Sequence, residues 1–285
     1  MSETFIEHNK QSGIGFLLDV KSRLHSEQTE YQSIEIYDTT KFGRLMVIDG
    51  CIMLTDRDNF LYHEMMSHPV LFTHDHPKDV LIIGGGDCGT MQAVLKHDSV
   101  TRVEQVEIDE RVTRLSEEYF PDLCTSNSDP RASLHFVDGI KWVQDATPES
   151  YDIIIIDSTD PVGPAEGLFT APFYRDCYKA LRTGGIIVQQ SESPLLHMSI
   201  LEAMHRDLNA SGYTSVATLF FPQTVYPSGW WSATMGGKAR DVRRYREQDA
   251  GNKNFDTLYY NVDIHRAALA MPEFFKQRIT TLSGS

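Results

Sequence analysis

The stretch from Val80 to Thr90 reads VLIIGGGDCGT, and it decides the fold class. A short apolar run leads into Gly84, Gly86 and Gly89, which fit the GxGxxG spacing of the turn between a strand and a helix in dinucleotide-binding folds. In those folds a pyrophosphate binds at the helix N-terminus. Asp87, however, lies inside the loop, where a carboxylate would repel a phosphate. The stretch therefore predicts a Rossmann-like strand–turn–helix unit and leaves open whether its ligand is an anion.

Apolar runs alternate with acidic or glycine-rich turns along the chain after Pro77. Strands are expected at residues 80–83, 103–108, 134–137, 151–156 and 186–190, with helices at 110–119 and 173–181. The runs are continuously apolar, as in parallel strands that are covered on both faces. The pattern predicts an α/β fold with a doubly wound, Rossmann-like sheet of the methyltransferase type in residues 59–285.

Two further features help to place the last elements. Ser193 followed by Pro194 is typical of a helix start, and Gly212 of the end of the same helix. A strand is expected within 228–237, and a polar connector within 249–254.

The first 58 residues have a different pattern. Between Gln32 and Thr55 the apolar residues alternate with polar ones, and the segments are interrupted at KFG (41–43) and DG (49–50). This predicts a small antiparallel β domain in residues 1–58. A connecting helix is expected at 59–72, interrupted at Pro69.

Composition excludes several classes of protein. The 285 residues are 41% hydrophobic and 23% charged, and no apolar run is long enough to cross a membrane. The N-terminus lacks the features of a secretory signal, and the four cysteines form no CxxC pair, so reduced thiols in the cytoplasm are expected. The net charge of −14, from 40 acidic and 26 basic residues, disfavours nucleic acid and is compatible with cationic ligands.

Acidic residues follow almost every predicted parallel strand, at the edge where such sheets bind ligands. They are Asp87, Glu107, Asp109, Asp138, Asp157 and Asp160. Two like charges 4 Å apart cost about 4 kcal/mol at an effective dielectric constant near 20, so clustered carboxylates require cations or protons. The cluster therefore predicts a nucleoside with a positively charged tail and a cationic second substrate.

Each of these acids also has a purely structural interpretation. Asp87 and Glu107 could cap helices, and Asp138 before Gly139 could be a turn residue. The run DSTDP (157–161) could be a β-turn in a loop. An acid about 20 residues after a glycine-rich turn commonly binds ribose hydroxyls, which favours a ligand-binding function for Glu107.

The motifs GGGDCG (84–89), VEID (106–109), FVDG (136–139) and DSTDPVGP (157–164) resemble those of the spermidine synthases, the aminopropyltransferase family, in their bacterial form. The resemblance begins at TEYQSI (29–34), includes GRLMVIDG (43–50) and YHEMM (62–66), and extends past LFTAPFY (168–174). It implies transfer of an aminopropyl group from decarboxylated S-adenosylmethionine to putrescine, which gives spermidine and 5′-methylthioadenosine. It implies neither a metal nor a cofactor, and a homodimer or higher homo-oligomer formed through the N-terminal domain.

The same resemblance implies the site residues. Those expected to bind the donor are Gln32, Asp87, Glu107, Asp138, Gly139 and Pro164. Those expected around the amine are Tyr62, His63, Asp87, Asp157, Asp160, Gln190 and Tyr226. Asp157 is the expected catalytic base, because a protonated amine has no lone pair and must lose a proton before it attacks the carbon next to sulfur.

Three local features leave alternatives open. Residues 161–170 could form a lid that orders over substrate or a static loop. Cys88 stands where many relatives have glycine; a Cβ is tolerable there if the residue has ordinary helical geometry, and a reactive thiol near the site is possible. The pair His74 and His76 is expected to lie on the surface rather than to bind a metal.

Three other functions compete with aminopropyl transfer. A putrescine N-methyltransferase would use intact S-adenosylmethionine, but Asp87 suits a tail that lacks a carboxylate. A polyamine-binding protein without catalysis would have no need of Asp157 at the amine. A nicotinamide dehydrogenase is suggested only by the glycine spacing. Putrescine, cadaverine and spermidine differ by a few atoms, so the acceptor stays open.

Overall fold

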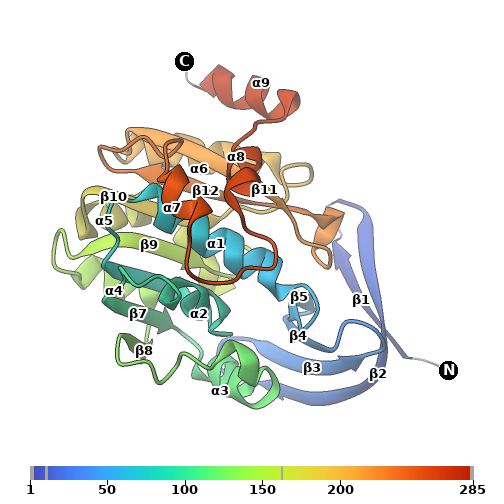
Figure 1. Cartoon of the computed structure of the whole chain (residues 1–285). Helices are drawn as coiled ribbons and strands as arrows, with labels where there is room; N and C mark the ends of the chain where they lie inside the picture. The colour runs from blue at the N-terminus through green and yellow to red at the C-terminus, as the bar shows by residue number, and fades with distance from the viewer. Residues whose placement is uncertain (1–2, 10–11, 162, 283–285) are drawn as a thin grey trace.

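The computed structural model describes residues 3–9, 12–161 and 163–282, which contain two β-sheets (Figure 1). The N-terminal sheet is antiparallel, with the strand order β1-β2-β3-β4-β5. Its strands are β1 (Glu3–Asn9), β2 (Ile14–Gln28), β3 (Ser33–Thr39), β4 (Arg44–Ile48) and β5 (Cys51–Thr55). The predicted antiparallel β domain is confirmed. The sequence pattern did not reveal β1 and β2, because most of their side chains are exposed on both faces.

The second sheet has the strand order β11-β12-β10-β9-β6-β7-β8. Its strands are β6 (Asp79–Gly84), β7 (Arg102–Glu107), β8 (Ala132–Phe136), β9 (Tyr151–Asp157), β10 (Leu181–Gln190), β11 (Ser215–Pro222) and β12 (Trp230–Gly237). The five strands β6 to β10 run parallel, and the β11–β12 hairpin joins β10 antiparallel. This confirms the predicted doubly wound, Rossmann-like sheet.

Helices cover both faces of this sheet because side chains alternate along each buried strand. The nine helices of the described residues are α1 (Asn59–Thr73), α2 (Gly89–Leu95), α3 (Glu110–Tyr119), α4 (Gly139–Asp145), α5 (Ala171–Ala180), α6 (Met198–Ala210), α7 (Glu247–Gly251), α8 (Val262–Ala268) and α9 (Glu273–Leu282). Val80 and Ile82 pack with α1 and α2, whereas Leu81 and Ile83 pack with α4, α5 and α6. Helix α3 packs against the N-terminal sheet instead.

Strands β6 and β9 lie side by side at the centre of the sheet, and from there the chain continues in opposite directions. A sheet of this type binds its ligands at that point, beyond the carboxyl ends of the strands. Gly84 pairs with Asp157 there, and the backbone N–H of Gly85 donates a 2.7 Å hydrogen bond to the carbonyl of Asp157. A Cβ on Gly84 would lie 2.1 Å from that carbonyl oxygen, so only glycine allows the two strands to approach in this way.

Two predicted helix boundaries are wrong. Helix α1 continues through Pro69 without interruption, to Thr73. Helix α6 begins at Met198 and not after Ser193, because Ser193–His197 forms a separate turn in which the Ser193 hydroxyl bonds that of Ser228 at 2.7 Å. The predicted end of α6 is correct, since Ser211 caps the helix and Gly212 follows with φ of +104°. No helix within residues 3–9, 12–161 and 163–282 could span a membrane.

Buried histidines make stability depend on pH. His205 is 3% exposed and its Nε2 lies 2.8 Å from the Thr218 hydroxyl; burial, with a smaller contribution from the charge of Arg243, lowers its pKa to about 4. The unfolded chain therefore binds a proton at His205 that the folded chain does not, between about pH 6.5 and 4. The contribution of His205 to the free energy of unfolding is therefore lost as the pH falls through this range.

We expect the stability advantage of the wild type over His205→Gln to shrink as the pH falls from 7.5 to 5. Below pH 6.5 the difference in the free energy of unfolding should decrease by about 1.4 kcal/mol for each pH unit. Urea unfolding of both proteins at each pH measures it. A difference that is constant over this range would show that His205 has the same pKa in the folded protein as in the unfolded chain.

Candidate active site

A cavity of about 160 Å³ opens beyond the carboxyl ends of β6, β7 and β9, with residues of the N-terminal sheet on its other side. Its acidic lining residues are Asp49, Asp87, Glu107, Asp138 and Asp157. The described residues that line it include no lysine or arginine. The cavity thus brings together four of the six acids that the sequence placed at strand ends, and Asp109 and Asp160 do not line it.

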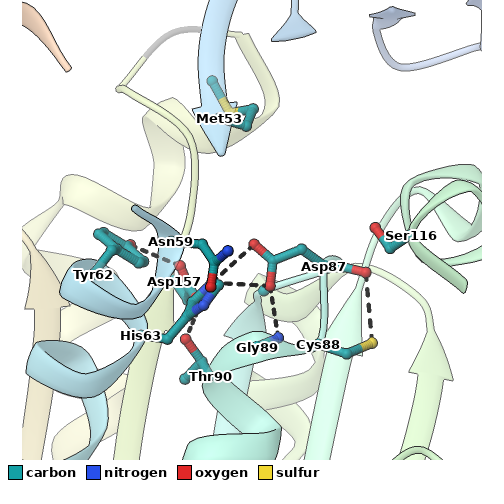
Figure 2. A network of polar contacts seen from close by, with 12 residues as sticks. Met53, Asn59, Tyr62, His63, Asp87, Cys88, Gly89, Thr90, Ser116 and Asp157 are labelled. Carbon is teal, nitrogen blue, oxygen red and sulfur yellow. Dashed lines mark hydrogen bonds and ion pairs between the residues drawn. The ribbon is translucent and has the colours of Figure 1, made fainter. Parts of the chain in front are cut away.

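Asp87 is paired with a histidine from α1 (Figure 2). Nε2 of His63 lies 3.2 Å from the Asp87 carboxylate, which also accepts a 2.7 Å hydrogen bond from the backbone N–H of Gly89. Burial alone would raise the pKa of Asp87, but the charge and hydrogen bond of His63 outweigh it and lower that pKa. Burial alone would lower the pKa of His63, but the charge of Asp87 outweighs burial and raises it. The contact therefore favours an ionised Asp87 next to a protonated His63.

Asp157 ends β9 and accepts hydrogen bonds from two hydroxyl groups (Figure 2). The Tyr62 hydroxyl donates to Oδ1 at 2.7 Å, and the Thr90 hydroxyl donates to Oδ2 at 2.5 Å. Burial, and then the charge of Asp87, raise the pKa of Asp157. Burial also raises the pKa of Tyr62 well above its usual value, so this phenol stays protonated and can only donate to the carboxylate. Asp157 is a positioned carboxylate with increased proton affinity, as a general base requires.

The β7 end of the cavity contains Glu107, which is 8% exposed. Burial raises its pKa to about 7, although its Oε1 accepts a 2.9 Å hydrogen bond from the N–H of Asp109. Asp109, and not Glu107, caps helix α3. Gln32 lines the same cavity, and its side-chain amide donates to Asp109 at 3.1 Å. Glu107 therefore has no capping function and points to a ligand.

Asp138 and Gly139 lie in the same cavity, at the start of α4. One oxygen of Asp138 caps this helix and accepts a 2.8 Å hydrogen bond from the N–H of Ile140. Asp138 therefore has a structural function at the start of α4 as well as a place in the cavity. A Cβ on Gly139 would lie 2.5 Å from a methyl group of Ile83, so a larger residue cannot fit unless the Ile83 side chain moves.

A smaller cavity of about 30 Å³ adjoins the first, and the two share Tyr62 and Tyr226 among their lining residues. Asp160 and Gln190 line it, as the amine assignment requires. The Tyr226 hydroxyl donates to the carbonyl of Met53 at 2.5 Å, which links the β11–β12 loop to the N-terminal sheet. All seven residues assigned to the amine therefore lie at or next to these two cavities.

Two acids at this second cavity were missed. Glu7 of β1 lines it, and Glu192, which is 1% exposed, lies against Asp160. Burial, and then the charge of Glu192, raise the pKa of Asp160 to about 8. Glu192 follows β10, so the rule that found the other strand-end acids could have found it. No signal distinguished Glu7, a single acid on an edge strand that the sequence pattern did not reveal.

The helical geometry that would accommodate Cys88 without strain is absent, and the expectation for His74 is wrong. Cys88 has φ of +69°, where a residue with a Cβ is strained and glycine is not. Its thiol is fully buried, and a contact with Cys124 followed by burial raises its pKa, which makes it unreactive. His74 is 8% exposed and caps the end of α1, so it is not a surface residue.

Within the part of the chain that the structure describes, no three His, Cys, Asp or Glu side chains are grouped as metal ligands.

Within the predicted lid, residues 163–169 form a 3₁₀ turn, η2 (Gly163–Phe169), beside the main cavity. Ala165 and Leu168 are buried and line the cavity. The side chain of Pro164 and the whole of Val162 lie outside the described residues. A mobile lid at this segment stays a prediction.

Replacing Asp87 with asparagine should lower the pKa of His63, because burial of the imidazole would then be opposed only by the smaller effects of the Asp157 and Glu64 charges. Titration of the His63 ring signals by NMR measures this pKa. Asp138→Asn serves as a matched control, since it removes a carboxylate from another wall of the cavity and should leave the His63 pKa unchanged. An unchanged His63 pKa in Asp87→Asn would contradict the ion pair.

Comparison with known proteins places both parts of the chain in one family. Residues 59–246 match the spermine/spermidine synthase domain, and residues 4–56 match the spermidine synthase tetramerisation domain. The chain is 59% identical over 278 residues to the polyamine aminopropyltransferase of Methylococcus capsulatus, which covers 98% of this chain and 97% of that protein. It is 64% identical over 265 residues to the protein of the same name from Thioalkalivibrio sulfidiphilus, covering 93% and 94%.

Solved structures agree with this assignment. A spermidine synthase in complex with the transition-state analogue AdoDATO superposes with a TM-score of 0.94 at 33% identity, covering 98% of this chain and 95% of that one. The spermidine synthase of Thermotoga maritima gives a TM-score of 0.92, also at 33% identity, with 98% and 94% covered. With both domains matched and close relatives aligned along nearly their whole length, the chain belongs to the spermine/spermidine synthase family.

Proposed function

We propose that the protein transfers the aminopropyl group of decarboxylated S-adenosylmethionine to putrescine, forming spermidine and 5′-methylthioadenosine. The observation that carries this assignment is the lining of the main cavity, where five acidic side chains face no lysine or arginine among the described residues. Such a cavity favours a sulfonium and ammonium groups and disfavours phosphates. Family membership supports the same reaction.

The donor fits the β6–β7 side of the cavity. Glu107 accepts hydrogen bonds from the ribose hydroxyls. Asp138 accepts from the adenine amino group with the carboxylate oxygen that does not cap α4. Gln32, Gly139 and Pro164 complete the nucleoside site. Asp87 binds the ammonium of the aminopropyl tail, and His63 fixes the orientation of that carboxylate.

The acceptor approaches from the second cavity. Its attacking amine binds beside the Asp157 carboxylate and the Tyr62 hydroxyl, while Asp160, Gln190 and Tyr226 surround the rest of the chain. Glu7 and Glu192 lie near Asp160, and burial raises the pKa of all three carboxyls, so the far ammonium favours their ionised forms when it binds. A cavity with acids at its far end suits a diamine better than a monoamine.

Asp157 removes the proton that the attacking ammonium must lose. The freed nitrogen lone pair forms a bond to the aminopropyl carbon next to sulfur, and the carbon–sulfur electron pair leaves with sulfur as a neutral thioether. Tyr62 and Thr90 hold the carboxylate in place while it accepts the proton. Bringing two cations together is a large part of the catalysis, and Asp87 and Asp157 offset their repulsion.

Assembly and location follow from the remaining features. The match to a tetramerisation domain supports a homo-oligomer, with a homodimer as its smallest form. The four cysteines are free, as in a reducing cytoplasm. The proposed reaction uses the donor as a co-substrate and needs no further cofactor.

Asp157→Asn should lower turnover by at least about a hundredfold, the range typical of a lost general base. Binding of 5′-methylthioadenosine, followed by calorimetry, should be largely retained, since the nucleoside contacts lie elsewhere. Asp145→Asn, at the exposed end of α4, is the matched control and should keep full activity. Near-normal turnover of Asp157→Asn would refute the proposed role.

The donor can be tested by competition. With decarboxylated and intact S-adenosylmethionine offered together and putrescine as acceptor, mass spectrometry should detect spermidine and no N-methylputrescine. The intact donor carries a carboxylate, for which the described cavity lining has no basic partner. Methyl transfer without aminopropyl transfer would overturn the assignment, and a panel of diamines in the same assay defines the acceptor.

A further inference from the structure

Cys88 lies in the turn between Asp87 and Gly89, on a strained backbone (Figure 2). Its φ of +69° is in the left-handed region, which a residue with a Cβ rarely adopts. Such strain is found most often at functional sites. The thiol does not line the main cavity; it belongs to the core beneath it and lies 3.8 Å from the side-chain nitrogen of Gln105. The strained cysteine therefore has no contact with the ligand that would explain it.

A second thiol lies against Cys88. Cys124 follows the 3₁₀ turn η1 (Pro121–Leu123) and packs against the core cluster that contains Cys88. The two thiols are in hydrogen-bonding contact, and Cys124 Sγ also lies 3.6 Å from the backbone carbonyl oxygen of Asp87. Both cysteines are free. The fold thus brings two thiols together directly behind the residue that is proposed to bind the donor ammonium.

The two thiols differ in exposure. Cys88 is fully buried, whereas Cys124 is partly exposed. Contact with Cys124, followed by burial, raises the pKa of Cys88, so Cys88 keeps its proton and by itself does not react with solutes. An oxidant therefore reaches Cys124 first, and Cys88 is the neighbour that can attack the oxidised sulfur.

We propose that Cys88 and Cys124 form an oxidation site, in which a peroxide joins the two sulfurs in a reversible disulfide, and that this disulfide weakens binding of the donor through Asp87. The effect on the donor rests on the proposed function. The oxidation site itself rests only on the contact between the two thiols and on their exposure.

The chemistry needs a peroxide as the oxidant and nothing else. The Cys124 sulfur attacks one peroxide oxygen and the O–O bond breaks, so hydroxide leaves, takes up the thiol proton as water, and a sulfenic acid remains. Cys88 then has no ionised thiol beside it to keep its proton in place. Its sulfur attacks the Cys124 sulfur, the S–O bond breaks, and the hydroxide leaves with the Cys88 proton as a second water. Two thiols are oxidised to one disulfide, and one peroxide is reduced to two waters.

The disulfide acts on Asp87 because the peptide between Asp87 and Cys88 lies against both sulfurs. Bonded sulfur atoms are about 2.0 Å apart, much closer than thiols in hydrogen-bonding contact. Cys124 Sγ then exchanges its contact with the Asp87 carbonyl for the bond to Cys88, and this peptide has to adjust. The Asp87 carboxylate is aligned by the N–H of Gly89 and by His63. A change in the peptide disturbs that alignment, so the donor ammonium loses a charge-assisted hydrogen bond.

The test first asks whether the disulfide forms. The wild type is treated with hydrogen peroxide and digested without reduction, and mass spectrometry searches for a linked pair of peptides that contain Cys88 and Cys124 and have lost two hydrogen atoms. Cys124→Ser and Cys88→Gly each remove one of the two thiols. Cys51→Ala is the matched control, since Cys51 is the other partly exposed cysteine and lines the amine cavity.

Calorimetry then measures the effect on two ligands, comparing each oxidised protein with its own reduced form. Decarboxylated S-adenosylmethionine carries the ammonium that Asp87 would bind, whereas 5′-methylthioadenosine has no aminopropyl group. In the wild type and in Cys51→Ala we expect the linked peptides, donor binding weakened about tenfold, as for the loss of one charge-assisted contact, and unchanged binding of 5′-methylthioadenosine. Dithiothreitol should restore donor binding, which it would not do after methionine oxidation. Cys124→Ser and Cys88→Gly should show neither the link nor the weakening.

Three results would contradict the inference: no linked peptides in the oxidised wild type, linked peptides with unchanged donor binding, or equal weakening of both ligands, which would indicate a general disturbance of the nucleoside site. A reduced wild type that transfers no aminopropyl group to putrescine would refute the proposed function alone. The linked peptides still decide the oxidation site in that case, because their detection does not depend on turnover.

Discussion

The repulsion between Asp87 and Asp157 is the constraint on which the site depends. These carboxylates follow neighbouring strands, and Gly85 donates to the backbone carbonyl of Asp157, so the sheet itself fixes their proximity. Burial, and then the charge of Asp87, raise the pKa of Asp157, which gives this acid the character of a base while Asp87 stays ionised. Two cations at this point relieve the repulsion, and a phosphate would increase it.

Helix α1 controls both carboxylates through two consecutive residues. Tyr62 donates to Asp157 of β9, and His63 pairs with Asp87 after β6. The same helix follows directly on the N-terminal sheet, which supplies Glu7 and contacts Tyr226 through Met53. A Cβ on Gly89 would lie 2.2 Å from the His63 ring, so the glycine of α2 allows α1 to approach. The two sheets thus meet at the reacting groups, which explains why the site needs both.

The sequence was sufficient wherever function follows from topology. Carboxyl ends of parallel strands share one edge, so Asp87, Glu107, Asp138 and Asp157 could be brought together from strand pattern alone, and the same rule extends to Glu192. Prediction from the sequence failed where function depends on contacts between distant segments of the chain. Nothing local indicates that β1 reaches the amine cavity. The left-handed backbone of Cys88 was also missed, because φ at a single residue depends on the turn around it.

The buried titratable groups oppose one another in their effect on stability. Burial raises the pKa of Glu7 and Glu107 to about 7, so the folded protein binds protons there that the unfolded chain releases, and stability is lost as the pH rises above about 4.5. Burial lowers the pKa of His97 and His265 to about 3, and their contribution is lost as the pH falls below about 6.5. Between these limits the two contributions partly cancel. An ammonium near Glu7 and ribose hydroxyls at Glu107 would favour the ionised carboxylates and so reduce the first contribution without changing the second. The ligands would therefore change the pH dependence of stability as well as its magnitude.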